Sequence, residues 1–190
     1  MKQLLAILWL ISSNLLFAQP DSVRFYTLDE VRNASPDTIF AISLRKSKLT
    51  EIPTELLRFK HLRYLDLEKN NINNVLTLGE FKELVYLNLS RNDLQYFPVS
   101  VCQMAEIEEL VLNRNSFETV PPCISYCTKL RKIDFWETPV RSLPGEMQSL
   151  KNLEIIDFTG VKMNPTGQKK LKEQFPNVEL KLDSPCDCMY

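Results

Sequence analysis

The stretch LVYLNLSRNDLQYFP, residues 84–98, decides the fold of this chain. Apolar residues occupy its positions 1, 4, 6, 11 and 14, while an asparagine stands at position 9 and a proline at position 15. The pattern also begins at Ile39, Leu62, Ile107, Leu130 and Leu153, so successive repeats start 23, 22, 23, 23 and 23 residues apart. A period this constant indicates a stacked array rather than a globule built around a pocket.

The centre of each repeat predicts a strand. Positions 4 and 6 alternate with positions 3, 5 and 7, so the two sets point to opposite sides of an extended backbone. Strands that recur every 23 residues, each followed by a crossover, should stack as a parallel sheet. The asparagines at position 9 are expected to satisfy backbone groups where the chain leaves the sheet. Prolines at position 15 favour an extended or turn-like return rather than a long helix.

These segments resemble the leucine-rich repeat family in its short LxxLxLxxNxLxxLP form, over roughly residues 39–182. The resemblance implies an α/β fold, a horseshoe-shaped solenoid of about six repeats with a parallel β-sheet on its concave face. It also implies that the concave face is the usual partner site, although the fold alone does not define a function.

A stacked array needs caps at both ends, because one repeat cannot bury enough surface to stand alone. We expect an N-terminal cap at residues 19–38, repeats at residues 39–163, and a C-terminal cap with a tail at residues 164–190. Thr27 and Glu30 have the spacing of a capping box. Asn164 and Pro165 introduce a helix that should be followed by a final strand around Leu180.

Residues 1–18 are expected to be a secretory signal peptide, since Lys2 precedes an apolar run and Ala18 precedes a plausible cleavage point. The apolar run is too short and interrupted to span a bilayer, so no membrane insertion is expected. The predicted location is therefore exported: periplasm, cell surface or extracellular medium. The formal net charge of −1 does not indicate binding to nucleic acid or to a membrane surface.

All five cysteines follow the predicted signal, which permits disulfide bonds. Cys127 stands where other repeats carry Phe or Met, and we expect it to be a buried small hydrophobe. Cys102 and Cys123 fall on the outer segments of adjacent repeats and could form a bridge. Cys186 and Cys188 could tie down the last strand, pair with a partner, or lie in a frayed tail.

Sequence motifs for catalysis are scarce. His61 is the one histidine and has no spaced Cys or Ser partner that would indicate a triad. Four glycines and no glycine-rich loop argue against phosphate or dinucleotide binding, and two cysteines one residue apart make a poor zinc motif. The chain is therefore not expected to be an enzyme or to hold a cofactor or metal.

The sheet positions that the stacking of repeats does not require are the candidates for function. Positions 3, 5 and 7 place Tyr64 beside Tyr86 and put Trp136 further along the same face, whereas position 8 forms a basic column over four repeats. Aromatic residues among charges have the composition of interface anchors, but β-propensity alone would also favour tyrosine on a half-buried sheet. The predicted partner-binding residues are Tyr64, Asp66, Tyr86, Arg91, Arg114, Asp134 and Trp136.

The sequence thus predicts a non-catalytic module that binds a protein or peptide on its concave face. Aromatic side chains would supply buried area, and the basic column would attract an acidic segment. The alternative is a structural component of the cell envelope that assembles through its cysteines or its convex face.

Overall fold

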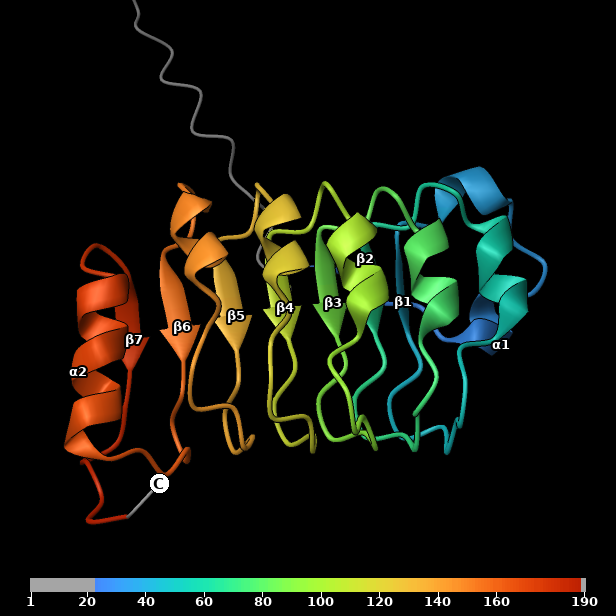
Figure 1. Ribbon diagram of the computed structural model, residues 1–190. Coiled ribbons are helices and arrows are strands. Elements are labelled where there is room, and N and C mark those ends of the chain that lie inside the picture. Colours follow the sequence, from blue (N-terminus) through green and yellow to red (C-terminus); the bar gives the residue numbers. More distant parts are fainter. Residues whose placement is uncertain (1–22, 189–190) are drawn as a thin grey trace, which may run out of the picture.

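The computed structural model describes residues 23–188, which form one seven-stranded parallel sheet with the strands in chain order. Figure 1 shows the strands side by side, with short coiled segments along one face of the sheet. The strands are β1 (Ala41–Ser43), β2 (Tyr64–Asp66), β3 (Tyr86–Asn88), β4 (Glu109–Val111), β5 (Lys132–Asp134), β6 (Ile155–Asp157) and β7 (Glu179–Lys181).

The register is the one that the repeat predicts. Position 3 pairs with position 3 in every neighbouring strand, as in Tyr64 with Tyr86 and Glu109 with Lys132. Positions 4 and 6 are buried in the core, where leucine, isoleucine and phenylalanine predominate. A continuous core of this kind explains why each repeat depends on its neighbours for stability.

The return path of each of the first five repeats contains a short 3-10 helix, which the expected extended or turn-like return did not include. These helices are η3 (Thr54–Arg58), η4 (Leu76–Glu80), η5 (Val99–Gln103), η6 (Pro122–Tyr126) and η7 (Gly145–Ser149), and an earlier one, η2, spans Pro36–Thr38. Proline precedes four of the five in the repeats, at a position where its fixed φ starts a turn and its missing N–H leaves no donor unpaired. The proline therefore begins a compact helix rather than preventing one.

The predicted role of the asparagines at position 9, which together form an asparagine ladder along the sheet, is confirmed. Asn92 is buried; its amide nitrogen donates to the carbonyls of Leu67 and Leu89, at 3.0 Å each, and its Oδ1 accepts from the Ile72 N–H. Asn70 and Asn115 make equivalent bonds. Each buried amide satisfies backbone groups of its own turn and of the preceding one, which would otherwise be isolated from water.

A helix precedes the first strand, and another lies between the last two. α1 (Leu28–Val31) begins at a capping box in which Thr27 and Glu30 bond reciprocally. α2 (Pro165–Gln174) begins at Asn164, whose side chain accepts from the Gly167 N–H, and β7 follows it. Figure 1 shows α1 at one end of the array and α2 at the other.

The proposed signal peptide, residues 1–18, lies outside the described residues. Within residues 23–188, no helix has the length and apolar character needed to cross a membrane.

Candidate functional site

The sheet face away from the 3-10 helices carries positions 3, 5 and 7 of every repeat. Its N-terminal end is covered by the chain itself: Tyr26 forms a single parallel bridge with Ile42, and the ring of Phe25 contacts two tyrosines. The Phe25 centroid lies 6.4 Å from that of Tyr64 and 6.3 Å from that of Tyr86, both edge-on. Tyr64 is consequently only 9% exposed.

The predicted tyrosine pair exists, with 6.4 Å between its ring centroids. Burial, together with the nearby carboxylates of Asp66 and Glu109, raises the pKa of the Tyr86 phenol. Tyr86 stays neutral and half-buried, whereas Tyr64 has little surface left for a partner. Phe25 was not among the predicted site residues, because it precedes the first repeat and no periodic signal marks it.

Asp66 and Asp134 have a local role in addition to the predicted one. Each accepts a bond from the backbone N–H two residues later: Glu68 donates to Asp66 at 3.0 Å, and Trp136 donates to Asp134 at 2.8 Å. The side chain thereby holds the turn that ends each strand. Burial raises the pKa of both carboxyls.

The basic column lies at the turn where the chain leaves the sheet, not across the middle of the face. Its members have left-handed backbone angles: φ is 57° at Lys46, 58° at Lys69, 54° at Arg91 and 53° at Arg114. Each N–H nevertheless bonds to the next repeat, as in Arg91 to the Asn113 carbonyl at 2.9 Å. Gly160, at the equivalent position of the sixth repeat, is the one residue there whose type indicates a left-handed turn.

Two members of this column are already engaged within the chain. Arg114 lies 4.3 Å above the Trp136 ring and bonds to Glu137 at 2.6 Å. Arg91 approaches a Glu68 oxygen at 3.9 Å. Lys46 and Lys69 are exposed and remain available at the edge of the sheet.

The part of the face over β4 to β6 carries an apolar group. Val111, Trp136 and Ile155 lie there at repeat positions that face away from the core, and all three are half-buried. Polar cross-strand pairs surround them: Lys132 to Glu109 at 2.6 Å, and Asn113 to Asp134 at 2.7 Å. The arrangement presents apolar area within a polar border, which is the composition of a protein interface.

The cysteines and the histidine lie away from this face. Cys102 is joined to Cys123, which links η5 to η6, and Cys186 is joined to Cys188. Cys127 is fully buried, and burial raises the pKa of its thiol to about 12. The pairing of Cys186 with Cys188 differs from all three expectations. The Cys186 N–H donates to the Met163 carbonyl, and the Gln168 side chain donates to the Asp183 carbonyl, so hydrogen bonds hold this part of the tail.

Together, these features define a solenoid repeat protein in which buried asparagines link adjacent turns beside a parallel sheet. The chain is a leucine-rich repeat protein: a family profile described as "Leucine rich repeat" matches residues 41–94, and the same geometry continues through β7. Proteins with this fold are in general interaction modules rather than enzymes.

The chain is similar to volume-regulated anion channel subunits of vertebrates. It is 31% identical to subunit LRRC8A of Homo sapiens over 93 residues, which is 47% of this chain but only 12% of that protein. It is 32% identical over 99 residues to a leucine-rich repeat and calponin homology domain-containing protein of Mus musculus, covering 52% of this chain and 14% of that one. The chain therefore spans a small part of the curated relatives it matches.

Two solved bacterial structures show the same fold. A leucine-rich repeat protein of Leptospira interrogans superposes with a TM-score of 0.59 at 23% identity, covering 70% of this chain and 40% of that chain. Internalin C2 of Listeria monocytogenes superposes with a TM-score of 0.58 at 20% identity, covering 64% of this chain and 52% of that chain.

Proposed function

We propose that this chain binds a protein or peptide on the β4 to β6 part of its concave face, without catalysis at that face. The observation that carries the proposal is the half-buried group Val111, Trp136 and Ile155, which the repeat does not require for stacking. Family membership supports protein binding in general, and this apolar group supports the β4 to β6 part of the concave face as its location.

The polar border would set the orientation of the partner. Glu109 and Lys132 form one ion pair at the edge of the apolar group, and Asp157 and Lys181 approach within 3.9 Å to form another. Partner groups can exchange with such partly exposed pairs at little cost, because exposed ion pairs contribute little to stability. Arg114 stacked on Trp136 adds a flat surface with an apolar centre and a charged edge.

Co-precipitation with partners from the native host tests the location. Trp136→Ala should reduce partner recovery at least about tenfold, as expected for the loss of a central aromatic anchor. Arg91→Glu should also reduce recovery if the basic column attracts an acidic partner segment. Recovery by both variants equal to that of the wild-type chain would contradict the concave location. Gln148→Ala in the outer helix η7 is the matched control and should bind normally, because this exposed side chain belongs to neither candidate surface.

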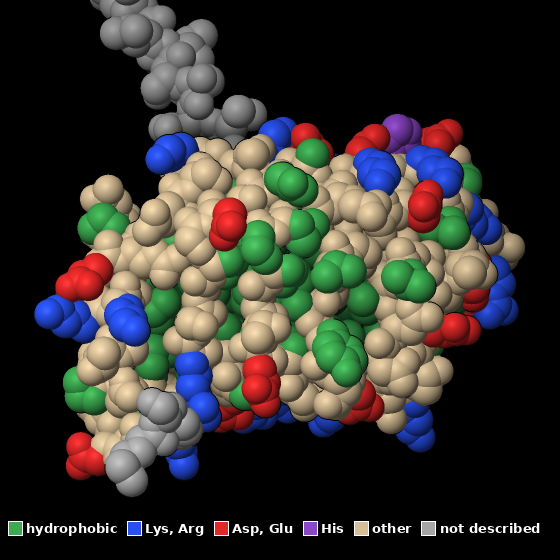
Figure 2. Space-filling model, in the orientation of Figure 1, with side chains coloured by type: hydrophobic (Ala, Val, Ile, Leu, Met, Phe, Trp, Pro, Cys, Tyr) green, Lys and Arg blue, Asp and Glu red, His purple; other side chains and the backbone are tan. Residues whose placement is uncertain are grey.

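The convex face supports a second candidate, assembly with further copies of the chain. Leu76, Tyr96, Val99 and Tyr126 are 76%, 86%, 56% and 71% exposed, and all lie on the outer segments of repeats two to four. Figure 2, viewed from this side, shows apolar side chains gathered over the middle of the array with few charged ones among them. Apolar side chains gathered on an exposed face in this way are a mark of interaction surfaces.

Sedimentation equilibrium separates the two candidates. If the convex face mediates assembly, the wild-type chain self-associates and Tyr96→Ser with Val99→Ser restores the monomer. A wild-type chain that stays monomeric at high concentration would exclude this candidate and leave concave binding untouched. The alternative through cysteines has less support, because four of the five are paired within the chain and the fifth is buried.

We also propose that residues 1–18 direct export and that the mature chain begins at Gln19. The two intrachain disulfides support an oxidising location. N-terminal sequencing of the protein recovered from the producing cells should read Gln-Pro-Asp. An intact N-terminus on protein that stays in the cytoplasm would contradict export.

A further inference from the structure

The two disulfides differ in what they join. Cys102 and Cys123 are 21 residues apart and link two outer helices. Cys186 and Cys188 are two residues apart, so their bond encloses only Asp187. A disulfide stabilises a fold chiefly by closing a loop of the unfolded chain, and the effect grows with loop length. The bond between Cys186 and Cys188 therefore adds little to the stability of the cap, and a role in holding the fold does not account for it.

The segment that carries this pair is held in place. The Cys186 N–H donates to the Met163 carbonyl at 3.0 Å, and the side chain of Gln168 donates to the Asp183 carbonyl at 2.9 Å. The Asp183 carboxylate in turn accepts from the Gly160 N–H at 2.8 Å. Both cysteines are partly exposed. The disulfide is thus presented to solvent from a fixed position rather than from a loose end.

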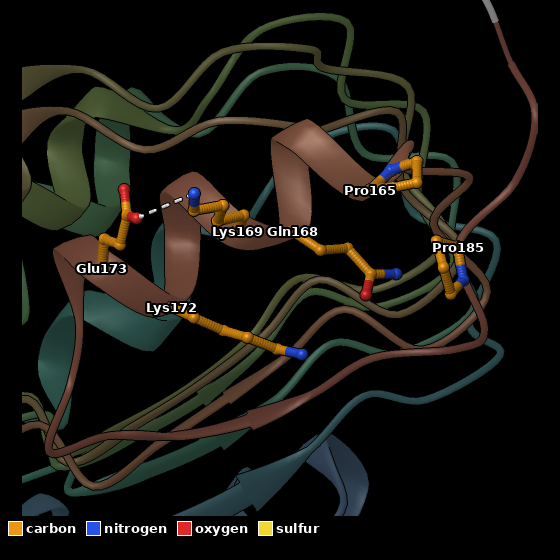
Figure 3. A pocket seen from close by; sticks show the side chains of 6 residues that line it. All are labelled: Pro165, Gln168, Lys169, Lys172, Glu173 and Pro185. Carbon is orange, nitrogen blue, oxygen red and sulfur yellow. Dashed lines mark ion pairs between the residues drawn. The ribbon is translucent and has the colours of Figure 1, made fainter.

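A groove of about 530 Å³ adjoins the pair, between α2 and Pro185, the residue before Cys186. Figure 3 shows Gln168 and Lys172 extending from α2 toward the segment that carries Pro185, while Lys169 and Glu173 pair with each other along the helix. The Lys172 ammonium makes the groove electrostatically complementary to an acidic side chain of an extended peptide.

We propose that Cys186 and Cys188 form a redox-active pair that exchanges its disulfide with the dithiol of a protein substrate. This adds an activity to a chain whose sequence motifs predict no enzyme, at residues outside the concave group Val111, Trp136 and Ile155. Exposed disulfides with little structural role are the ones that exchange readily.

The exchange balances with the substrate dithiol as reductant. A substrate thiolate attacks Sγ of Cys188, the bond between the two cysteines breaks, and the electron pair remains on Sγ of Cys186. The second substrate thiolate then attacks the substrate sulfur of the mixed disulfide and releases the Cys188 thiolate. The substrate loses two electrons and two protons, which the chain gains as two thiols. A low-molecular-weight disulfide such as oxidised glutathione restores the pair.

Equilibration of the full chain in graded glutathione buffers, followed by alkylation and mass spectrometry, tests the proposal. Cys186 and Cys188 should become half-reduced at a ratio of reduced to oxidised glutathione at least about tenfold lower than Cys102 and Cys123. Reduction of both bonds at the same ratio would overturn the proposal.

Transfer to a substrate is the second measurement. The oxidised wild-type chain should convert a reduced two-cysteine peptide with acidic flanks to its disulfide, one peptide per chain. Cys102→Ser with Cys123→Ser should retain this transfer, and Cys186→Ser with Cys188→Ser should abolish it while leaving the Tm nearly unchanged. Lys172→Glu should slow transfer to the acidic peptide. Equal transfer by the Cys186/Cys188 double variant and the wild-type chain would overturn the proposal.

Discussion

Phe25 packs edge-on against Tyr86, with 6.3 Å between ring centroids, although the two residues belong to segments separated by two strands of the sheet. The chain thus covers the N-terminal end of its own concave face with a residue from before the first repeat. The contact lies outside the half of the face over β4 to β6, where we propose that a partner binds.

Phe25→Ala should destabilise the fold by about 1–2 kcal/mol, less than a fully buried phenylalanine would, because the ring is only partly buried. Urea unfolding measures the change. Phe40→Ala is the control, since the Phe40 ring is 48% exposed and should matter little. Equal effects of the two substitutions would show that the Phe25 contacts carry no stability.

Asn92→Ala should destabilise the array by about 2–3 kcal/mol, because the Ile72 N–H and several carbonyls would lose their partner inside the core. Asn73→Ala removes an exposed amide of a neighbouring repeat and should change stability by less than about 0.5 kcal/mol. Urea midpoints compare the two variants. A small loss of stability in Asn92→Ala would contradict this, because it would mean that water takes over the hydrogen bonds of the Asn92 side chain.

Gly160, at the position 8 turn, and Gly145, at the start of η7, form a matched pair of glycines. Gly160 has φ of +77°, and an added Cβ would lie 2.7 Å from Cγ of Glu137, so Gly160→Ala should cost about 1–2 kcal/mol. Gly145 has open space around it, so Gly145→Ala should be neutral or stabilise by up to about 1 kcal/mol through the unfolded chain. The Tm values of the two variants, measured by thermal unfolding, should therefore shift in different directions or by clearly different amounts.

Asp134→Asn should gain stability relative to the wild-type chain as the pH rises. Burial raises the pKa of Asp134 above its ordinary value of 3.8, so the folded state holds the proton more tightly than the unfolded state does. The resulting stability is fully present below pH 3.8 and is lost as the pH rises through the folded pKa. Asparagine does not titrate, so the Asp134→Asn variant has no such loss of stability. Asn88, in the equivalent place, already accepts the turn bond from the Ser90 N–H.

Urea unfolding at pH 3 and pH 7 measures this difference. Asn88→Asp provides the mirror variant and should lose stability relative to the wild-type chain over the same range, because it buries a new carboxyl. A difference between Asp134→Asn and the wild-type chain that is the same at both pH values would contradict the account.

The repeat register could be predicted from sequence because each strand position is fixed by burial. Leu87 and Leu89 must face the core, so Tyr86 must face the other side, and the period then places Tyr64 beside it. The asparagine ladder followed from the same register, since position 9 always falls at the turn out of the sheet.

The contents of the site were harder to predict. No repeat rule covers Phe25, and the left-handed turn at Arg91 depends on backbone geometry that most residues adopt only at a cost in free energy. The turn role of Asp66 could have been inferred from asparagine or aspartate recurring at position 5, two residues before a backbone N–H that needs an acceptor. Val111 and Ile155 also stand at sheet positions that stacking does not require, but β-propensity alone favours such residues in a strand, so their type does not mark a partner contact.

Site-specific photocrosslinking in the native host tests the binding face most directly. A benzophenone amino acid at Ile155 on the concave face should crosslink to a discrete partner protein, and the same group at Tyr126 on the convex face should not. Trp136→Ala should remove the Ile155 crosslink. A partner captured from Tyr126 but not from Ile155, or an Ile155 crosslink that persists unchanged in Trp136→Ala, would contradict the concave binding face.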